Sequence, residues 1–197
     1  MTRLIVYSTA FVAFLGATAM TLAAIFIPDW ITWTVDTTDG GRFTKTIGLH
    51  RSCSSTMGHC IHYPQEEDCS GTDRYFCSMW RSVGFMMSLT AVLELATLLA
   101  YIVVILGGKQ KREAGWKMLA SMLLLIGVVQ CASMAIVAYL FDNDERFFVG
   151  WKLDKSWVLC TVSWSIAVLS AACISLSAFV FPPEDGYELI PSERHGR

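Results

Sequence analysis

The chain has 197 residues, of which 54% are hydrophobic and only 16% are charged, and its mean hydropathy is +0.47. Soluble domains usually carry about 25% charged residues, so this composition indicates an integral membrane protein. The formal net charge of -2 provides no basic surface of the kind that nucleic-acid binding requires. Nucleic acid is therefore not an expected partner, and the lipid bilayer is the first partner that the sequence predicts.

Four apolar runs are each long enough to cross a bilayer, which takes about 20 residues. The runs cover 4–27, 83–106, 116–141 and 157–181. The first run has an alternative interpretation as a cleaved signal peptide, since Arg3 precedes it. The apolar part of a signal peptide is usually only about 7–15 residues long, so we expect an uncleaved helix.

Charges and cysteines predict the same orientation in the membrane. Residues 107–115 form a short connection rich in lysine and arginine, and such connections stay on the cytosolic side. With four crossings, both termini and the tail 182–197 are then cytosolic, while the segments 28–82 and 142–156 lie outside the cell. We expect a multi-pass protein of the plasma membrane.

The first external segment holds four of the seven cysteines, which are Cys53, Cys60, Cys69 and Cys77. Thiols outside the cell oxidise, so the sequence predicts two disulfides that stabilise a small external domain. Four cysteines allow three pairings. We favour the sequential one, Cys53 with Cys60 and Cys69 with Cys77, because short loops close easily.

The same segment carries the pattern of a β-hairpin. Residues 33–36 and 43–49 are rich in threonine, valine and isoleucine, and Asp39, Gly40 and Gly41 between them are typical turn residues. We therefore expect two antiparallel strands ahead of the first cysteine pair.

Histidines near the cysteines offer a zinc site as an alternative, since imidazole and thiolate are the usual ligands of zinc. However, His50, His59 and His62 lack the paired spacing of a zinc site, and the secretory pathway oxidises thiols. We expect no metal ion and no cofactor.

A set of spaced residues runs from the end of the first apolar run to the start of the second. Its members are Trp30, Gly48, Leu49, His50, Cys53, Cys60 and Arg81. This set resembles the signature of the claudin superfamily, which includes claudins, peripheral myelin protein relatives and the gamma-type auxiliary subunits of channels and receptors. The family usually has tryptophan in place of His50 and a longer gap between the two cysteines. The chain thus resembles a divergent member.

The resemblance implies an all-α membrane fold: a left-handed four-helix transmembrane bundle that carries a small extracellular antiparallel β-sheet. One strand of that sheet would come from the second external segment. The resemblance also implies that residues 1–197 form a single claudin-like domain.

Glu94 is the one acidic residue well inside an apolar run. A charge at that depth costs at least about 2.5 kcal/mol, so the side chain must be neutral, paired or in contact with a partner. Gln130 lies at a similar expected depth in the antiparallel third run. Three roles remain open for Glu94: a structural hydrogen bond with Gln130, contact with a partner's helix, and an ion or proton pathway.

The second external segment contains the aromatic residues Phe147, Phe148 and Trp151. Exposed aromatic side chains favour a protein contact. The alternative is that at least one of them rests on the membrane surface or packs against the first external segment. Arg51, beside His50, is reminiscent of the auxiliary-subunit branch of the family and is a further contact candidate.

In the tail, Tyr187 to Ile190 resembles a tyrosine-based endocytic sorting signal. Matches of this length arise easily by chance, so the alternative is an ordinary polar tail.

No set of residues suited to catalysis gathers on one side of the membrane, so we expect no enzyme. The resemblance implies contacts of the extracellular sheet and the helices in a cell–cell junction such as a tight junction, in adhesion or in a paracellular barrier. The partners would be the protein itself or other claudin-like proteins. The alternative is an auxiliary subunit that modulates the gating or trafficking of an ion channel or receptor.

Overall fold

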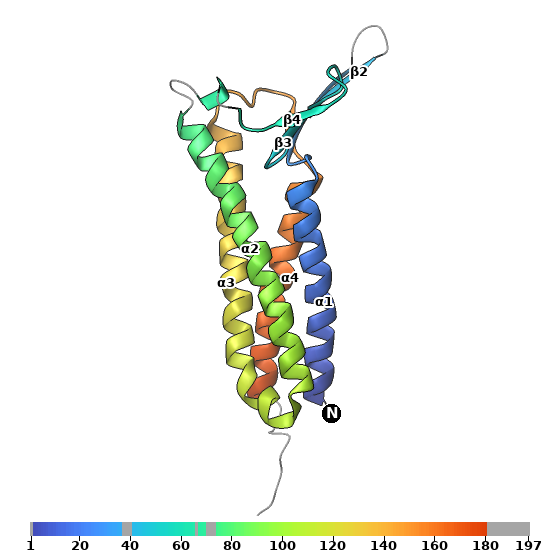
Figure 1. Ribbon diagram of the computed structural model, residues 1–197, viewed down its shortest axis with the longest axis vertical. Helices are drawn as coiled ribbons and strands as arrows, with labels where there is room; N and C mark the ends of the chain where they lie inside the picture. Colours follow the sequence, from blue (N-terminus) through green and yellow to red (C-terminus); the bar gives the residue numbers. More distant parts are fainter. Residues whose placement is uncertain (1, 37–40, 66, 70–73, 181–197) are drawn as a thin grey trace, which may run out of the picture.

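The structure is a computed structural model that describes residues 2–36, 41–65, 67–69 and 74–180. It is an elongated bundle of helices with a β-sheet at one end (Figure 1). In chain order, the elements are α1 (Thr2–Phe26), β1 (Ile31–Asp36), β2 (Arg42–Ile47), β3 (Arg51–Ser54), β4 (Cys60–His62), the short 3-10 helix η1 (Glu67–Cys69), α2 (Arg74–Leu106), α3 (Gly108–Asn143), β5 (Trp151–Leu153) and α4 (Lys155–Val180).

Within the described part of the chain, four helices are long and apolar enough to cross a membrane. The stretches are Leu4–Phe26, Arg74–Leu106, Ala114–Asn143 and Lys155–Val180. Large apolar side chains such as Val12, Val92 and Leu169 lie on the outside of the bundle and are 63–66% exposed. An outer surface of this kind suits contact with lipid. The expected fold class is therefore present in its coarse form, as four long apolar helices and a small antiparallel sheet.

Two helices extend beyond the apolar runs. α2 begins at Arg74 rather than near residue 83, and only Gly107 separates α2 from α3 where the sequence predicted a turn over 107–115. For α3 the reason is that lysine, arginine, glutamine and glutamate, which fill positions 109–113, are good helix formers. The end of an apolar run therefore predicts where the helix leaves the lipid, but it does not predict where the helix ends. The other helix ends agree with the predicted runs to within two residues.

The sheet has five strands in the order β4-β3-β2-β1-β5, and every neighbouring pair is antiparallel. The predicted hairpin is present, with β1 paired to β2 so that Ile31 lies opposite Ile47. Two of its predicted turn residues, Asp39 and Gly40, lie outside the described part of the chain. β5 comes from the second connecting segment and pairs with β1, which is the arrangement that the family resemblance implied.

A close approach between two parts of the chain explains Gly48, which follows β2. A Cβ atom at this position would lie 2.5 Å from Cα of Pro28, just after α1. A side chain here would force the two backbones apart. Glycine therefore lets the sheet approach the end of the first helix.

Hydrogen bonds around Trp30 join the sheet to the bundle. The indole of this fully buried residue donates from Nε1 to the carbonyl of Ala24 at 2.7 Å. Its backbone N–H donates to β2 and its carbonyl accepts from Asp154, both at 3.0 Å. Ser156 donates from Oγ to the carbonyl of Ile27 at 3.0 Å, so the start of α4 is tied to the end of α1.

Both disulfides of the sequential pairing are present. Cys53 and Cys60 lie opposite each other on β3 and β4, and Cys69 of η1 is joined to Cys77 in α2. The first disulfide links two neighbouring strands, and the second ties η1 to the helix. Cys53 and Cys60 are therefore not available as the thiolate ligands of the zinc alternative.

Removing the disulfide between Cys53 and Cys60 should lower the free energy of unfolding. A closed loop with a sequence separation of 7 is expected to contribute about 2–3 kcal/mol, because the cross-link restricts the unfolded chain. The measurement compares denaturant unfolding of the purified protein with that of C53A/C60A. C131A is the control, because Cys131 forms no disulfide. Unchanged stability of the double variant would contradict this role.

Candidate interaction surface

One face of the sheet gathers aromatic side chains near the loop that joins α3 to β5. Side chains alternate along a strand, and the pairing places Trp33 opposite Trp151 on one side and Lys45 on the other. The ring centroid of Trp33 lies 5.4 Å from that of Phe43, 5.7 Å from that of Phe148 and 6.1 Å from that of Trp151. We call these four aromatic residues the aromatic surface.

Part of the aromatic surface and its border are open to solvent. Phe148 is 58% exposed, and the adjacent Val149 is 96% exposed. Val35, which is paired with Phe43 across the strands, is 37% exposed. Neighbouring apolar side chains that remain in water often mark a contact site. This part of the sheet is therefore the best candidate for a protein contact.

The loop reaches the sheet through Gly150, which has a positive φ of 108°. A side chain is rarely compatible with that backbone conformation. A Cβ atom at Gly150 would also lie 3.0 Å from Nε1 of Trp33. The glycine thus allows the loop, and with it Phe148, to lie close to Trp33.

Phe147 and Phe148 have different surroundings. The ring of Phe147 lies 6.0 Å from that of Phe76 in α2, 5.8 Å from that of Phe141 in α3 and 5.6 Å from that of Trp151. It packs against the core at the sheet end of the bundle. Of the predicted aromatic contact residues, Phe147 therefore packs inward, Phe148 is exposed, and Trp151 lies between them.

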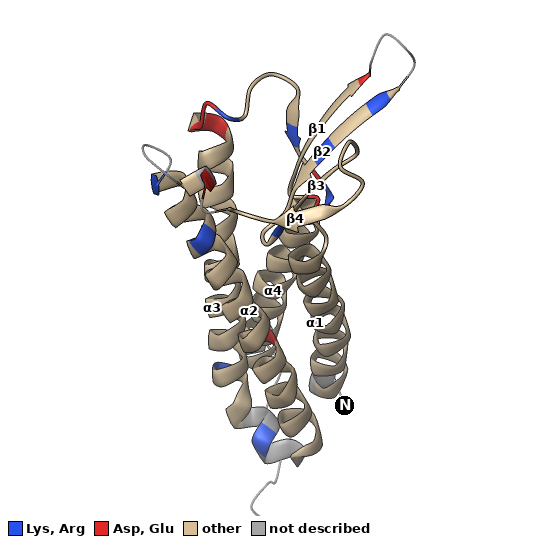
Figure 2. Ribbon diagram, turned by 45° about the horizontal axis from the view of Figure 1, so that its top comes forward, with Lys and Arg blue, Asp and Glu red and all other residues tan. Residues whose placement is uncertain are grey.

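Arg51, the other contact candidate, lies on the opposite face of the sheet. It pairs with His62, whereas the next residue, Ser52, pairs with Ile47 on the face of the aromatic surface. Lys152 of β5 also alternates onto the opposite face, since it follows Trp151. Figure 2 shows cations along the strands and an acidic group at the end of α3 beside the sheet. Arg51 and the aromatic surface thus lie on opposite faces of the sheet.

The residues of the family-like signature are spread over the junction between sheet and helices. Trp30 and Leu49 are buried there. His50 lies beside α2, where a Cβ atom on Gly84 would be 3.3 Å from its Cε1 atom. Arg81 is exposed on α2. Trp30, Leu49 and His50 therefore lie where the sheet meets the helices, and Arg81 lies outside this junction.

A second group of polar residues lies inside the bundle, where each of the four helices contributes one side chain. Thr21, Glu94, Gln130 and Ser163 are all 0% exposed, and we call them the polar centre. Thr21 donates to Oε1 of Glu94 at 2.8 Å. Nε2 of Gln130 donates to the same oxygen at 3.2 Å and to the Thr21 hydroxyl at 2.8 Å. The hydroxyls of Thr21 and Ser163 are 2.7 Å apart.

The geometry favours the structural hydrogen bond among the three roles of Glu94. Glu94 and Gln130 are fully buried, so neither reaches the surface where a partner's helix would lie. Residues 83–106 contain no lysine, arginine or histidine to pair with the carboxyl. A neutral carboxyl is therefore expected at this depth. Oε2 of Glu94 and Oε1 of Gln130 have no hydrogen-bond partner among the described residues.

No pattern in the sequence indicates that Thr21 belongs to the polar centre. A threonine hydroxyl in a helix usually bonds to the carbonyl four residues earlier, and Thr21 also makes that bond, to Ala17 at 3.2 Å. Ser163 belongs to a four-residue repeat of small side chains in α4, which signals close helix packing and no particular partner. Only the packing of the helices shows that the two hydroxyls meet.

The candidate sorting signal in the tail stays a prediction. Tyr187 and Ile190 lie within residues 181–197, outside the part of the chain that the structure describes.

Comparison with known proteins assigns neither a family nor a function to the chain. No family model matches the chain, and no curated protein matches it. The functional argument therefore depends on the geometry of the sheet and the bundle.

Changing Gln130 to Leu should destabilise the bundle more than changing Glu94 to Gln. The first removes two interhelical donations, and such bonds average about 0.6 kcal/mol and reach about 1.7 kcal/mol, so we expect a loss of about 1–3 kcal/mol. The second keeps an acceptor oxygen in place and should cost less than about 0.5 kcal/mol. Unfolding of the purified variants by titration with sodium dodecyl sulfate measures both. A larger effect of E94Q than of Q130L would contradict the neutral structural role.

Proposed function

We propose that the protein is a non-enzymatic, claudin-like protein of the plasma membrane, with both termini in the cytosol and the sheet outside the cell. Two features support this orientation. The disulfides lie at the sheet end, and the connection between α2 and α3 lies at the opposite end of the bundle (Figure 1). Disulfides persist outside the cell, and a connection rich in cations stays inside it.

We propose further that the sheet and the helices make contacts in cell–cell junctions, in adhesion or in a paracellular barrier. The aromatic surface is the observation that carries this function. In the proposed orientation it lies beyond the membrane, with Phe148 and Val149 open to the extracellular space. Exposed aromatic anchors on a sheet suit binding to another protein, such as a second copy or another claudin-like protein.

Changing Phe148 to Ser should weaken accumulation of the protein at contacts between two expressing cells. Loss of one contact residue worth about 1 kcal/mol lowers the bound fraction roughly fivefold when binding is weak. Fluorescence of the tagged protein at borders between two expressing cells, relative to borders with non-expressing cells, gives the measurement. Y75S is the matched control, because Tyr75 at the start of α2 is 62% exposed and lies outside the aromatic surface. Equal accumulation of F148S and the unchanged protein would contradict the contact role.

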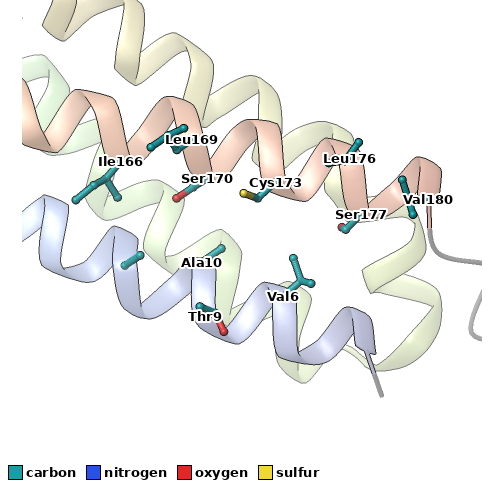
Figure 3. A pocket seen from close by; sticks show the side chains of 11 residues that line it. Val6, Thr9, Ala10, Ile166, Leu169, Ser170, Cys173, Leu176, Ser177 and Val180 are labelled. Atoms are coloured by element: carbon teal, nitrogen blue, oxygen red, sulfur yellow. The ribbon is translucent and has the colours of Figure 1, made fainter.

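A groove between α1 and α4 supports the second candidate function, an auxiliary subunit of a channel or receptor. The groove has a volume of about 580 Å³ and lies toward the end of the bundle away from the sheet (Figure 3). Its small side chains are Thr9, Ala10 and Ala13 on α1 and Ser170, Cys173 and Ser177 on α4. Small residues let helices approach closely within a membrane, so the groove suits a helix of a larger protein.

The substitution Ala13→Leu separates the two functions, because Ala13 is exposed in the groove and leucine would fill part of it. For a junction protein, A13L should leave accumulation at cell contacts unchanged. For an auxiliary subunit, A13L should remove a larger polytopic protein that otherwise purifies with the chain in mild detergent. The control is A19L, since Ala19 is exposed on α1 outside the groove.

A further inference from the structure

Two arginines lie on one side of the part of α2 that extends beyond the apolar run. Arg74 and Arg81 are seven residues apart, close to two helical turns, so their side chains share a face of the helix. Both border a hollow of about 580 Å³. Its lining includes the Cys69–Cys77 disulfide, Phe85 and Met86.

Neither arginine has a charged or hydrogen-bonding partner among the described residues. Arg74 and Arg81 are both exposed and form no ion pair or hydrogen bond there. The described lining of the hollow contains no acidic residue. Each guanidinium has five N–H donors in a planar fork, so the described part of the hollow presents two cationic groups that suit an anion.

The length of α2 places Arg81 at the level of lipid headgroups. Counted from Leu106 at the other end of the helix, about 20 residues cross the hydrocarbon layer, which puts its outer boundary near Met87. Arg81 then lies about 9 Å above that boundary, within reach of the headgroup layer. Arg74 lies about 10 Å farther out, beyond the headgroup layer, where its charge attracts an anionic lipid without touching it.

Apolar side chains continue below the arginines on the same side of α2. Phe85 is 69% exposed, Leu89 40% and Val92 63%. Their spacing of four and three residues makes a continuous strip along the helix. A pair of cations above an apolar strip complements a molecule with an anionic head and a hydrocarbon chain.

From this juxtaposition we propose that the hollow binds a membrane glycerophospholipid through its phosphodiester, with a preference for a lipid of net negative charge. Arg81 contacts the phosphodiester through two N–H groups and an acyl chain lies along the apolar strip, while Arg74 adds positive charge above the headgroup. Arginine suits this role because its fork matches two phosphate oxygens. The inference rests on the proposed membrane crossing and is independent of the cell-contact function.

The test measures lipid bound to the purified full-length protein. The protein is reconstituted with equal amounts of phosphatidylglycerol and phosphatidylcholine, extracted in mild detergent and analysed by native mass spectrometry. We expect preferential retention of phosphatidylglycerol. An arginine near a membrane surface contributes about fivefold in affinity for anionic lipid, so R81Q should reduce retention about fivefold, and R74Q, which removes a more distant charge, should reduce it less. R81K should fall between R81Q and the unchanged protein, since it keeps the charge and loses the fork.

The control is K155Q, because Lys155 is an exposed cation at the start of α4, at the same end of the bundle. K155Q should retain phosphatidylglycerol as the unchanged protein does. Equal retention of the two lipids, or an equal loss in K155Q and R81Q, would overturn the site. Complete displacement of the lipid by inorganic phosphate would also overturn it, because the site would then bind a free anion. If F148S fails to alter cell contacts while R81Q loses lipid, the contact function is wrong and the lipid site stands.

Discussion

The position of the sheet depends on one buried junction, in which Trp30 lies between the first helix and the strands. Its indole bonds to the carbonyl of Ala24, and its backbone bonds to β2 and to Asp154 after β5. A polar group that loses its partner in a buried setting costs about 1–3 kcal/mol, so tilting the sheet would break several bonds at that cost. The aromatic surface is therefore held at a fixed place relative to the bundle.

The Trp30 junction holds the sheet in position, and the polar centre holds the helices in position relative to one another. Lipid offers no hydrogen bonds, so buried polar side chains favour the one arrangement in which they meet. Thr21, Glu94, Gln130 and Ser163 meet only when all four helices have the present order and height. α2 connects both regions, since it carries Glu94 and also Trp80, which packs in the same buried cluster as Trp30. The helices thus determine where any contact surface lies.

Patterns in the sequence predicted the parts of this architecture that depend on length or alternation. A crossing helix needs a long apolar run, and a hairpin needs alternating residues around a turn, so both could be recognised. β5, with only Trp151–Leu153, is too short to show a pattern, and it was expected only from the family resemblance. The contrast between Phe147 and its neighbour Phe148 arises from packing against other elements and from the conformation of Gly150. The start of α2 at Arg74 was missed because arginine and serine residues interrupt the apolar pattern over 74–82, although the helix continues through them.

The position of the sheet outside the cell is the claim on which both the contact function and the lipid site depend. Lysine labelling tests it most directly, because Lys45 and Lys152 are exposed on the sheet and Lys111 is exposed near the connection between α2 and α3. A membrane-impermeant amine reagent is applied to intact cells, and each lysine is then quantified by mass spectrometry. Modification of Lys45 and Lys152, with Lys111 modified only after permeabilisation, is the predicted result. Modification of Lys111 alone in intact cells would place the sheet in the cytosol and contradict the account.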